Sequence, residues 1–211
     1  KDRIQVYEGG INEESQDKET GYEQVAPTVY ALVAAIDAKD SFTFQHSTNV
    51  SQYAVLLAQK LGLSRNDIQT VKVAGLLHDI GKIGIPESIL KKAGKLTNEE
   101  YEIMKSHVEK SIEMIHYLPN MNYVIPAVVS HHERYDGKGY PRGIKGEEIP
   151  FLGRILAVCD SFDAMISKRA YKEPLSVEYA MGELEKNKGT QFDPEVADAF
   201  IELIKEGKVP L

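Results

Sequence analysis

The stretch His78-Asp79-Ile80-Gly81-Lys82 is followed later in the chain by His131-His132-Glu133 and then by Gly139-Tyr140-Pro141. Imidazoles beside carboxylates are typical ligands of divalent transition metals, and an aspartate next to a histidine can bridge two metal ions. Further residues of the same types occur elsewhere in the chain. The candidate ligands are His46, His78, Asp79, His107, His131, His132 and Asp160. Their number and type predict a hydrolytic centre that holds two metal ions.

A single histidine on an apolar helix face is usually a hydrogen-bonded core residue and predicts little. Here, however, five of the six histidines fall in these motifs. Burying five imidazoles at separate places would cost desolvation five times over. One shared metal centre gives all of them a partner, and Asp79 and Asp160 supply the negative charge. The sixth histidine, His116, has no such motif beside it and is expected to be an ordinary, partly exposed residue.

The residues around the motifs repeat with the period of an α-helix. Val29, Leu32, Val33 and Ile36, for example, have the spacing of one buried stripe. The segment 136–150 is rich in glycine and proline and is expected to be a loop. No alternating strand pattern competes with the helical one. The expected helices cover residues 22–36, 46–61, 64–81, 97–115, 122–133, 152–163, 176–188 and 193–206. The prediction is an all-α helical bundle.

Two helix boundaries are predicted from local signals. Gly81 is expected to end the helix that carries His78, because glycine is common just after a helix C-terminus. Thr97 begins a capping-box pattern, in which the N-cap residue and the third helical residue satisfy each other's backbone groups. The helix that it opens is expected to place Tyr101, Met104 and Val108 on its inner face, with His107 beside them.

Composition excludes several classes of protein. The 211 residues suffice for one well-buried domain, and the net charge of −7 argues against binding of a DNA or RNA polymer through a basic surface. No apolar run approaches the roughly 20 residues needed to span a bilayer. The single cysteine, Cys159, permits no internal disulfide, is expected to pack in the core, and fits a cytoplasmic protein.

The domain organisation is predicted from polarity. Residues 1–21 are polar and are expected to be a linker or the edge of an upstream domain, whereas residues 22–211 are expected to form the catalytic domain. The chain begins at Lys1 rather than at a methionine, so an upstream sensor or receiver domain is expected. The oligomeric state stays open, and a homodimer is one possibility.

The motifs resemble those of the HD superfamily of metal-dependent phosphohydrolases, whose name describes the doublet His78-Asp79. The later stretch from His131 to Pro141 narrows the resemblance to the HD-GYP subfamily. The likeness runs from about residue 40 to residue 193. A His-Asp doublet alone recurs by chance, but the two motifs in this order are specific. The resemblance implies the all-α HD fold with a glycine- and proline-rich loop around Gly139-Tyr140-Pro141.

The same resemblance implies an activity, which is hydrolysis of the bacterial second messenger cyclic di-GMP to linear pGpG, GMP or both. A hydroxide that bridges two divalent metals would attack the phosphodiester. Iron or manganese is favoured, and zinc, nickel or cobalt also suit such ligands. By position, one metal would be held by His46, His78, Asp79 and Asp160; the second, which Asp79 also bridges, by His107, His131 and His132.

Further positions match residues of the family that contact the nucleotide. Lys82 would act with Asp79 in catalysis, by offsetting charge that grows on the phosphate. Arg169 offers a planar fork for a phosphate or a guanine edge, and Asp163 could accept from a guanine or pair with Arg169. The residues expected to bind substrate are Lys82, Tyr140, Asp163, Arg169 and Lys172.

Two positions depart from the family pattern. Some members hold a third metal with a glutamate four residues before the histidine that matches His46, where this chain has Phe42. A phenylalanine cannot ligate a metal, so two metals are predicted. Tyr135 stands where the family usually has tryptophan, and a mild change in packing or base stacking is expected.

Two alternatives stay open beside the cyclic di-GMP phosphodiesterase. One is a regulatory module that binds a cyclic dinucleotide with little turnover. It predicts the loss of a ligand residue, yet every expected ligand is present. The other is hydrolysis of a different cyclic dinucleotide, such as cyclic GMP-AMP. Base selectivity depends on small differences in a pocket, so the residues do not separate these substrates.

Overall fold

The computed structural model describes residues 26–35, 43–168 and 173–211. Over these residues the chain folds into helices, and the only β-type pairing is one isolated bridge between Lys188 and Phe192. The prediction of an all-α bundle is therefore confirmed. No helix in this part of the chain combines the length and the apolar character needed to cross a bilayer.

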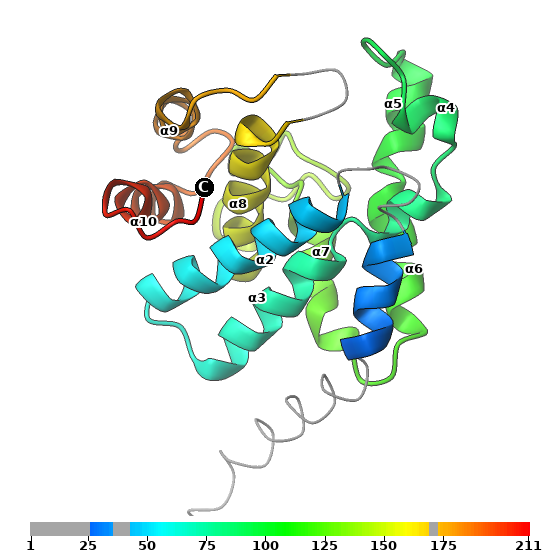
Figure 1. Ribbon diagram of the computed structural model, residues 1–211, viewed down its shortest axis with the longest axis horizontal. Helices are drawn as coiled ribbons and strands as arrows, with labels where there is room; N and C mark the ends of the chain where they lie inside the picture. Colours follow the sequence, from blue (N-terminus) through cyan, green and yellow to red (C-terminus); the bar gives the residue numbers. More distant parts are fainter. Residues whose placement is uncertain (1–25, 36–42, 169–172) are drawn as a thin grey trace, which may run out of the picture.

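Three helices form the centre of the bundle. α2 (Thr43–Lys60) and α3 (Arg65–Leu77) follow each other through a short turn and lie side by side, and α8 (Phe151–Ile166) packs against both (Figure 1). Ser64 caps α3, since its hydroxyl accepts a hydrogen bond from the backbone N–H of Asp67. The central helices are held by apolar burial. Cys159, fully buried in α8, is part of that core, as expected.

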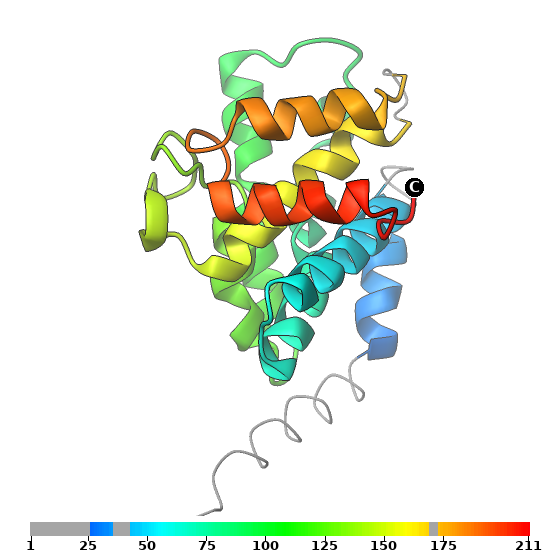
Figure 2. The ribbon, with the colours of Figure 1, turned by 90° about the vertical axis from the view of Figure 1, so that its left-hand side faces the viewer.

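Two helices close the bundle on one side. α9 (Val177–Lys186) and α10 (Pro194–Lys205) lie beside each other over α8, and Figure 2 shows them facing the viewer. Phe200 of α10 meets Tyr53 of α2 and Phe162 of α8 in a cluster of three buried rings, with centroids 5.1 to 6.0 Å apart. Asp193 caps α10 and Pro194 is its first residue, so the predicted start of this helix is confirmed.

The other side of the bundle is built from shorter pieces: η1 (Ile80–Gly84), α4 (Glu87–Leu90), α5 (Asn98–Lys105) and α6 (His107–His116). Thr97 and Glu100 form the predicted capping box. The prediction of a single helix over residues 97–115 is wrong, because the helix breaks at Ser106. The hydroxyl of Ser106 donates a hydrogen bond to the carbonyl of Ile103 at 2.6 Å. Tyr101 is about half exposed rather than on the inner face.

Gly81 does not end α3, which stops at Leu77 with His78 as its C-cap. Gly81 lies within η1 instead, where a Cβ atom would stand 2.0 Å from the carbonyl oxygen of His107. The glycine is needed so that η1 can lie against α6 (Figure 1). The prediction that Gly81 ends a helix is therefore wrong. A glycine is required at this position because η1 packs closely against α6.

The last elements carry the second histidine motif. η2 (Asn122–Val124) leads into α7 (Ile125–Ser130), and η3 (Gly146–Glu148) lies in the loop that was expected over residues 136–150. α7 is shorter than the expected helix over 122–133, since it ends before His131. Several expectations fall outside the described residues: the segment 1–21, the helix start near residue 22, and the positions of Ile36, Phe42, Arg169 and Lys172.

Candidate metal centre

Five helices bring the seven candidate ligands to one place. His46 lies on α2 and Asp160 on α8, whereas the others stand at helix ends. His78 is the C-cap of α3, Asp79 precedes η1, and His107 begins α6. The pair that follows α7 completes the set, with His131 as the C-cap of that helix. The ligand atoms form three overlapping groups: Asp79, His107, His131 and His132; His46, His78 and Asp79; and His78, His131 and Asp160.

The carboxylate of Asp79 lies close to two different sets of imidazoles. Its Oδ1 lies 3.2 Å from Nε2 of His107, and its Oδ2 lies 3.4 Å from Nε2 of His78 and 3.8 Å from Nε2 of His46. The two oxygens of one buried carboxylate thus face different sets of imidazoles. This placement suits a carboxylate that bridges two cations.

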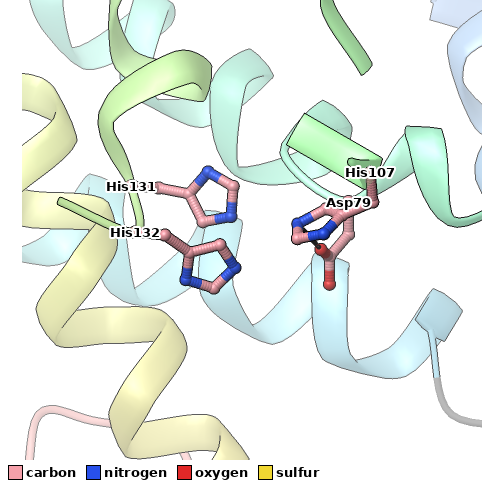
Figure 3. Close-up of side chains that lie close together, drawn as sticks. All are labelled: Asp79, His107, His131 and His132. Carbon is pink, nitrogen blue, oxygen red and sulfur yellow. Dashed lines mark ion pairs between the residues drawn. The ribbon is translucent and has the colours of Figure 1, made fainter. Parts of the chain in front are cut away.

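Asp160 of α8 contacts the same centre. Its Oδ1 is 3.1 Å from Nε2 of His46 and 3.9 Å from Nε2 of His78. His131 and His132 reach in from the end of α7 towards Asp79 and His107 (Figure 3). The rings of His131 and His132 lie 3.9 Å apart between centroids, so adjacent residues both contribute to one centre.

Backbone carbonyls fix the orientation of three imidazoles. The Nδ1 atoms of His78, His107 and His131 lie 2.6 to 2.8 Å from the carbonyl oxygens of residues 75, 104 and 128, each three residues earlier. A carbonyl only accepts, so Nδ1 carries the proton and a neutral ring presents a bare Nε2 lone pair. This arrangement is common in histidines that bind metals.

The atoms that point into the centre lack hydrogen-bond partners. Among the described residues, the buried side-chain atoms without a partner include Oδ1 of Asp79 and the Nε2 atoms of His46, His78, His107 and His131. Buried polar atoms are nearly always satisfied, and five such atoms without partners in one place are suited to a cation between them. Divalent metal ions would satisfy all of them, so the residues present fit the predicted metal centre.

The protonation states agree with this interpretation. Burial lowers the pKa of His132 to about 4, and burial together with His132 holds the pKa of His131 well below its usual range. Although burial opposes ionisation of Asp79, the nearby ammonium of Lys82 holds the pKa of its carboxyl well below normal. These groups are therefore neutral imidazoles and an ionised carboxylate, which are the forms that bind metals.

His46 differs from the other histidines. Burial acts to lower its pKa, but the carboxylates of Asp160 and Asp163 on its two sides outweigh this and raise the pKa to about 9. In the metal-free protein a proton on this imidazole therefore supplies the positive charge between the carboxylates. A metal that binds here replaces that proton.

A buried serine helps to hold the first motif in place. Ser111 of α6 accepts a hydrogen bond from the backbone N–H of Gly81 at 2.8 Å and donates one to the carbonyl of His78 at 3.0 Å. These bonds fix the chain on both sides of Asp79 against the helix that begins at His107. No motif surrounds Ser111 in the sequence, so its role was not predicted.

Lys82 lies at the edge of the centre. Its Nζ is 2.5 Å from Oδ2 of Asp79, and its side chain is about one-fifth exposed. The ammonium group therefore stands where the buried ligands meet solvent. This is where an anionic substrate would approach the metals.

The loop after His132 folds back over the centre. Oε1 of the buried Glu133 accepts hydrogen bonds from the backbone N–H groups of Arg142 and Gly143 at 2.7 and 3.2 Å. Gly139 lies so close that a Cβ atom would be 2.3 Å from the backbone nitrogen of Arg134. As a result, Tyr140 stacks on the ring of His132, with centroids 4.8 Å apart and planes 30° apart.

Two neighbours of the predicted substrate residue Tyr140, namely Tyr101 and Lys105, were missed in the sequence. Tyr101 of α5 meets Tyr140 edge to face, with centroids 6.4 Å apart. Nζ of Lys105 lies 5.3 Å from the centroid of Tyr101 and 5.6 Å from that of Tyr140. We call Tyr101, Lys105 and Tyr140 the aromatic edge. The exposed Tyr101 could have been found only by knowing that α5 faces the loop.

The other expected substrate residues have different outcomes. Asp163 has no exposed surface, and its carboxylate bonds Nδ1 of His46 at 2.7 Å, so in this structure it cannot face a guanine. Asp163 was predicted to contact the substrate, but in this structure it contacts the candidate metal ligand His46 instead. Arg169 and Lys172 lie outside the described residues. His116 is exposed and bonds Asn122, as expected of a residue outside the centre.

Comparison with known proteins agrees with the motifs. The HD domain family matches residues 31–196. A cyclic di-GMP phosphodiesterase of Thermotoga maritima is 44% identical over 170 residues, which are 80% of this chain and 46% of the relative. The response regulator RpfG of Xanthomonas campestris, also named a cyclic di-GMP phosphodiesterase, is 41% identical over 85% of this chain and 48% of its own length. The 3'3'-cGAMP-specific phosphodiesterase 2 of Vibrio cholerae is 39% identical over 82% of this chain and 34% of its own length.

This chain therefore spans half or less of the length of these relatives. Among solved structures, a cyclic GMP-AMP-specific phosphodiesterase of Vibrio cholerae has a TM-score of 0.68 at 18% identity, covering 86% of this chain and 49% of its own. Bd1817 of Bdellovibrio bacteriovorus has a TM-score of 0.65 at 18% identity, covering 90% and 70%. These structures share the fold. The chain belongs to the HD domain family, and its motifs place it in the HD-GYP group of that family.

Proposed function

We propose that this chain is a metal-dependent phosphodiesterase that hydrolyses cyclic di-GMP to linear pGpG, GMP or both. The observation that carries the proposal is the position of Asp79, whose two oxygens face two different sets of unpartnered imidazoles. Such a carboxylate divides one buried cluster into two adjoining cation sites. Two adjoining cations are suited to phosphodiester hydrolysis.

The seven candidate ligands would be divided between two metal ions as the family resemblance implies. His46, His78, Asp79 and Asp160 would hold one divalent ion, and Asp79, His107, His131 and His132 the second. Iron or manganese is favoured by the imidazole and carboxylate donors, with zinc, nickel and cobalt also suited to them. When bound, two such ions activate water and offset the charge of the phosphate.

The side chains around the metals would bind and orient the nucleotide. Lys82, at the exposed edge, would place its ammonium against a phosphate oxygen and stabilise charge that develops there. The aromatic edge would provide a stacking surface for a purine base, with Lys105 beside it for a phosphate. Arg169 and Lys172 stay predictions as further substrate contacts.

A second substrate is supported by one observation. Relatives named for cyclic di-GMP and for 3'3'-cGAMP are similar to this chain over nearly the same share of its length. The same metals and Lys82 would serve both substrates, because both carry the same phosphodiester linkage. The regulatory-module alternative is not favoured, since the structure brings all seven candidate ligands together.

The proposal is tested on anaerobically purified protein by measuring metal content and turnover of cyclic di-GMP and cyclic GMP-AMP on the same sample. We expect two metal ions per chain and hydrolysis of cyclic di-GMP. Two metals with tight nucleotide binding and no turnover would support the regulatory module instead. Fewer than one metal per chain after reconstitution with iron and manganese would contradict the metal centre.

Lys82 should affect turnover without affecting metal content. Replacing Lys82 with alanine removes the ammonium beside Asp79, and we expect kcat to fall by about 10²–10³-fold, the usual cost of losing one group that stabilises transition-state charge. Metal content should stay at the wild-type level, since a cation rather than a ligand is lost. Steady-state kinetics and elemental analysis measure the two effects. The Lys91→Ala variant, which changes the exposed C-cap residue of α4, is the matched control. An unchanged kcat in Lys82→Ala would remove Lys82 from the mechanism.

Tyr101 should affect substrate binding alone. Truncation by Tyr101→Ala removes one ring of the aromatic edge, and base stacking of about 1 kcal/mol corresponds to roughly a fivefold rise in KM. The value of kcat should not change, because Tyr101 does not contact the candidate ligands. Tyr179→Ala, which removes an equally exposed tyrosine from α9, is the control. Equal KM values for the two variants would exclude Tyr101 from the substrate site.

A further inference from the structure

We propose that Asp163 positions the imidazole of His46 and thereby sets the metal affinity of the half of the centre that contains His46 and Asp160. The inference rests on the metal centre of the proposed function and deepens it. It concerns a side chain that is fully buried and that the structure places behind a candidate ligand.

The imidazole of His46 is held from both sides by one helix. Its Nδ1 lies 2.7 Å from Oδ2 of Asp163, and its Nε2 lies 3.1 Å from Oδ1 of Asp160. Residues three apart on a helix share a face, so α8 presents both carboxylates to the same ring. Because a carboxylate accepts, Nδ1–H donates to Asp163 and Nε2 is directed to the centre.

Asp163 is itself held in place by two further donors. The side-chain amide of Asn49 donates to Oδ1 at 2.8 Å, and the hydroxyl of Ser167 donates to Oδ2 at 2.9 Å. Together with Nδ1 of His46, three donors surround a carboxylate that has no contact with solvent. The carboxylate therefore cannot turn away from His46 without breaking buried hydrogen bonds.

Among the candidate ligands whose Nδ1 contacts are described, His46 differs in having a carboxylate at Nδ1. The Nδ1 atoms of His78, His107 and His131 bond neutral backbone carbonyls. An anionic partner at Nδ1 makes an imidazole a more basic ligand than a carbonyl partner does. A substitution can also remove the side chain of Asp163, whereas no substitution removes a backbone carbonyl. A single residue outside the ligand set, Asp163, therefore controls the metal affinity of the half of the centre that contains His46.

The test is the Asp163→Asn variant, which removes the charge and keeps the shape. Metal-free protein is titrated with Mn²⁺ by calorimetry, and the rise in Tm on adding Mn²⁺ is measured on the same samples. Loss of a carboxylate that supports a ligating histidine typically weakens metal binding by about 10–100-fold. We expect a loss of that size at one of two sites, and a smaller rise in Tm.

The matched control is Asp193→Asn. Asp193 is also buried and ion-paired, with Arg154 at 2.5 Å, but it contacts none of the candidate ligands. A purely structural role of Asp163 would lower Tm equally with and without Mn²⁺ and leave the Kd for Mn²⁺ unchanged, and that result would overturn the inference while leaving the proposed function intact. Wild-type protein that binds no Mn²⁺ or other divalent metal would overturn both.

A second variant covers the case in which Asp163→Asn does not fold. The double variant Asn49→Ala, Ser167→Ala keeps the carboxylate and removes two of the donors that hold it. We expect this protein to bind Mn²⁺ more weakly than wild type at the same single site. Wild-type affinity in the folded double variant would show that the orientation of Asp163 does not matter and would overturn the inference.

Discussion

Replacing Asp79 with asparagine should reduce kcat/KM for cyclic di-GMP by at least about 10³-fold, because the proposed two-metal centre would contribute several kcal/mol to the stabilisation of the transition state. The carboxylate of Asp79 faces both sets of imidazoles, through Oδ1 on the His107 side and Oδ2 on the His78 side. The amide has the same shape but no charge. We therefore expect metal content to fall together with turnover.

Three measurements on Asp79→Asn check this expectation: metal per chain by elemental analysis, kcat/KM, and helix content by circular dichroism. Helix content should match wild type, since the change keeps the size of the side chain. Asp193→Asn again serves as the control for the loss of a buried carboxylate elsewhere. Wild-type turnover in Asp79→Asn would be incompatible with a bridging role.

The second large effect is expected on stability, from Gly81→Ala. The new methyl group would stand 2.0 Å from the carbonyl oxygen of His107 and 2.4 Å from the backbone nitrogen of Ser111. Both atoms belong to the backbone of α6 and cannot move aside as a flexible side chain would. Overpacking of this kind costs about 3 kcal/mol of unfolding free energy or more, which lowers Tm by roughly 6–12 °C.

Gly81→Ala should also disturb the metal centre, because the shift separates Asp79 from His107. Thermal unfolding and Mn²⁺ titration measure the two effects. The control is Gly182→Ala on α9, where a Cβ atom meets nothing within 4 Å. That exposed helical position should gain about 0.5–1 kcal/mol. Wild-type Tm and metal affinity in Gly81→Ala would contradict the close contact between η1 and α6.

Much of the fold could be predicted because its signals are local. Thr97 with Glu100, and Asp193 before Pro194, mark helix starts through bonds to their own neighbours, and the structure confirms both. The break at Ser106 could not be predicted. The apolar spacing continues across it, so the period of the residues is the same for one helix or two.

The sequence predicted which residues make up the candidate site but not how they are arranged. Clustering of histidine and aspartate types identified seven residues that the structure brings together, and metal binding by them stays a prediction. The resemblance assigned Asp160 to a metal and Asp163 to the substrate, but the sequence could not show that Asp163 lies buried against His46, because both aspartates lie on the same face of α8 and differ only in what stands opposite. It also could not show that Tyr101 faces Tyr140, since that contact depends on how α5 packs.

The order of the ligands along the chain has a consequence for synthesis. The HD doublet is made early, whereas Asp160 lies on α8 and the helices that cover it come last. Domains fold as their residues emerge from the ribosome, so a nascent chain that ends before α8 carries six of the ligands without the seventh. The complete centre forms only when most of the domain has been translated. If the proposed metals bind, their loading would therefore be a late step in maturation, and metal content would report on chains that have finished folding.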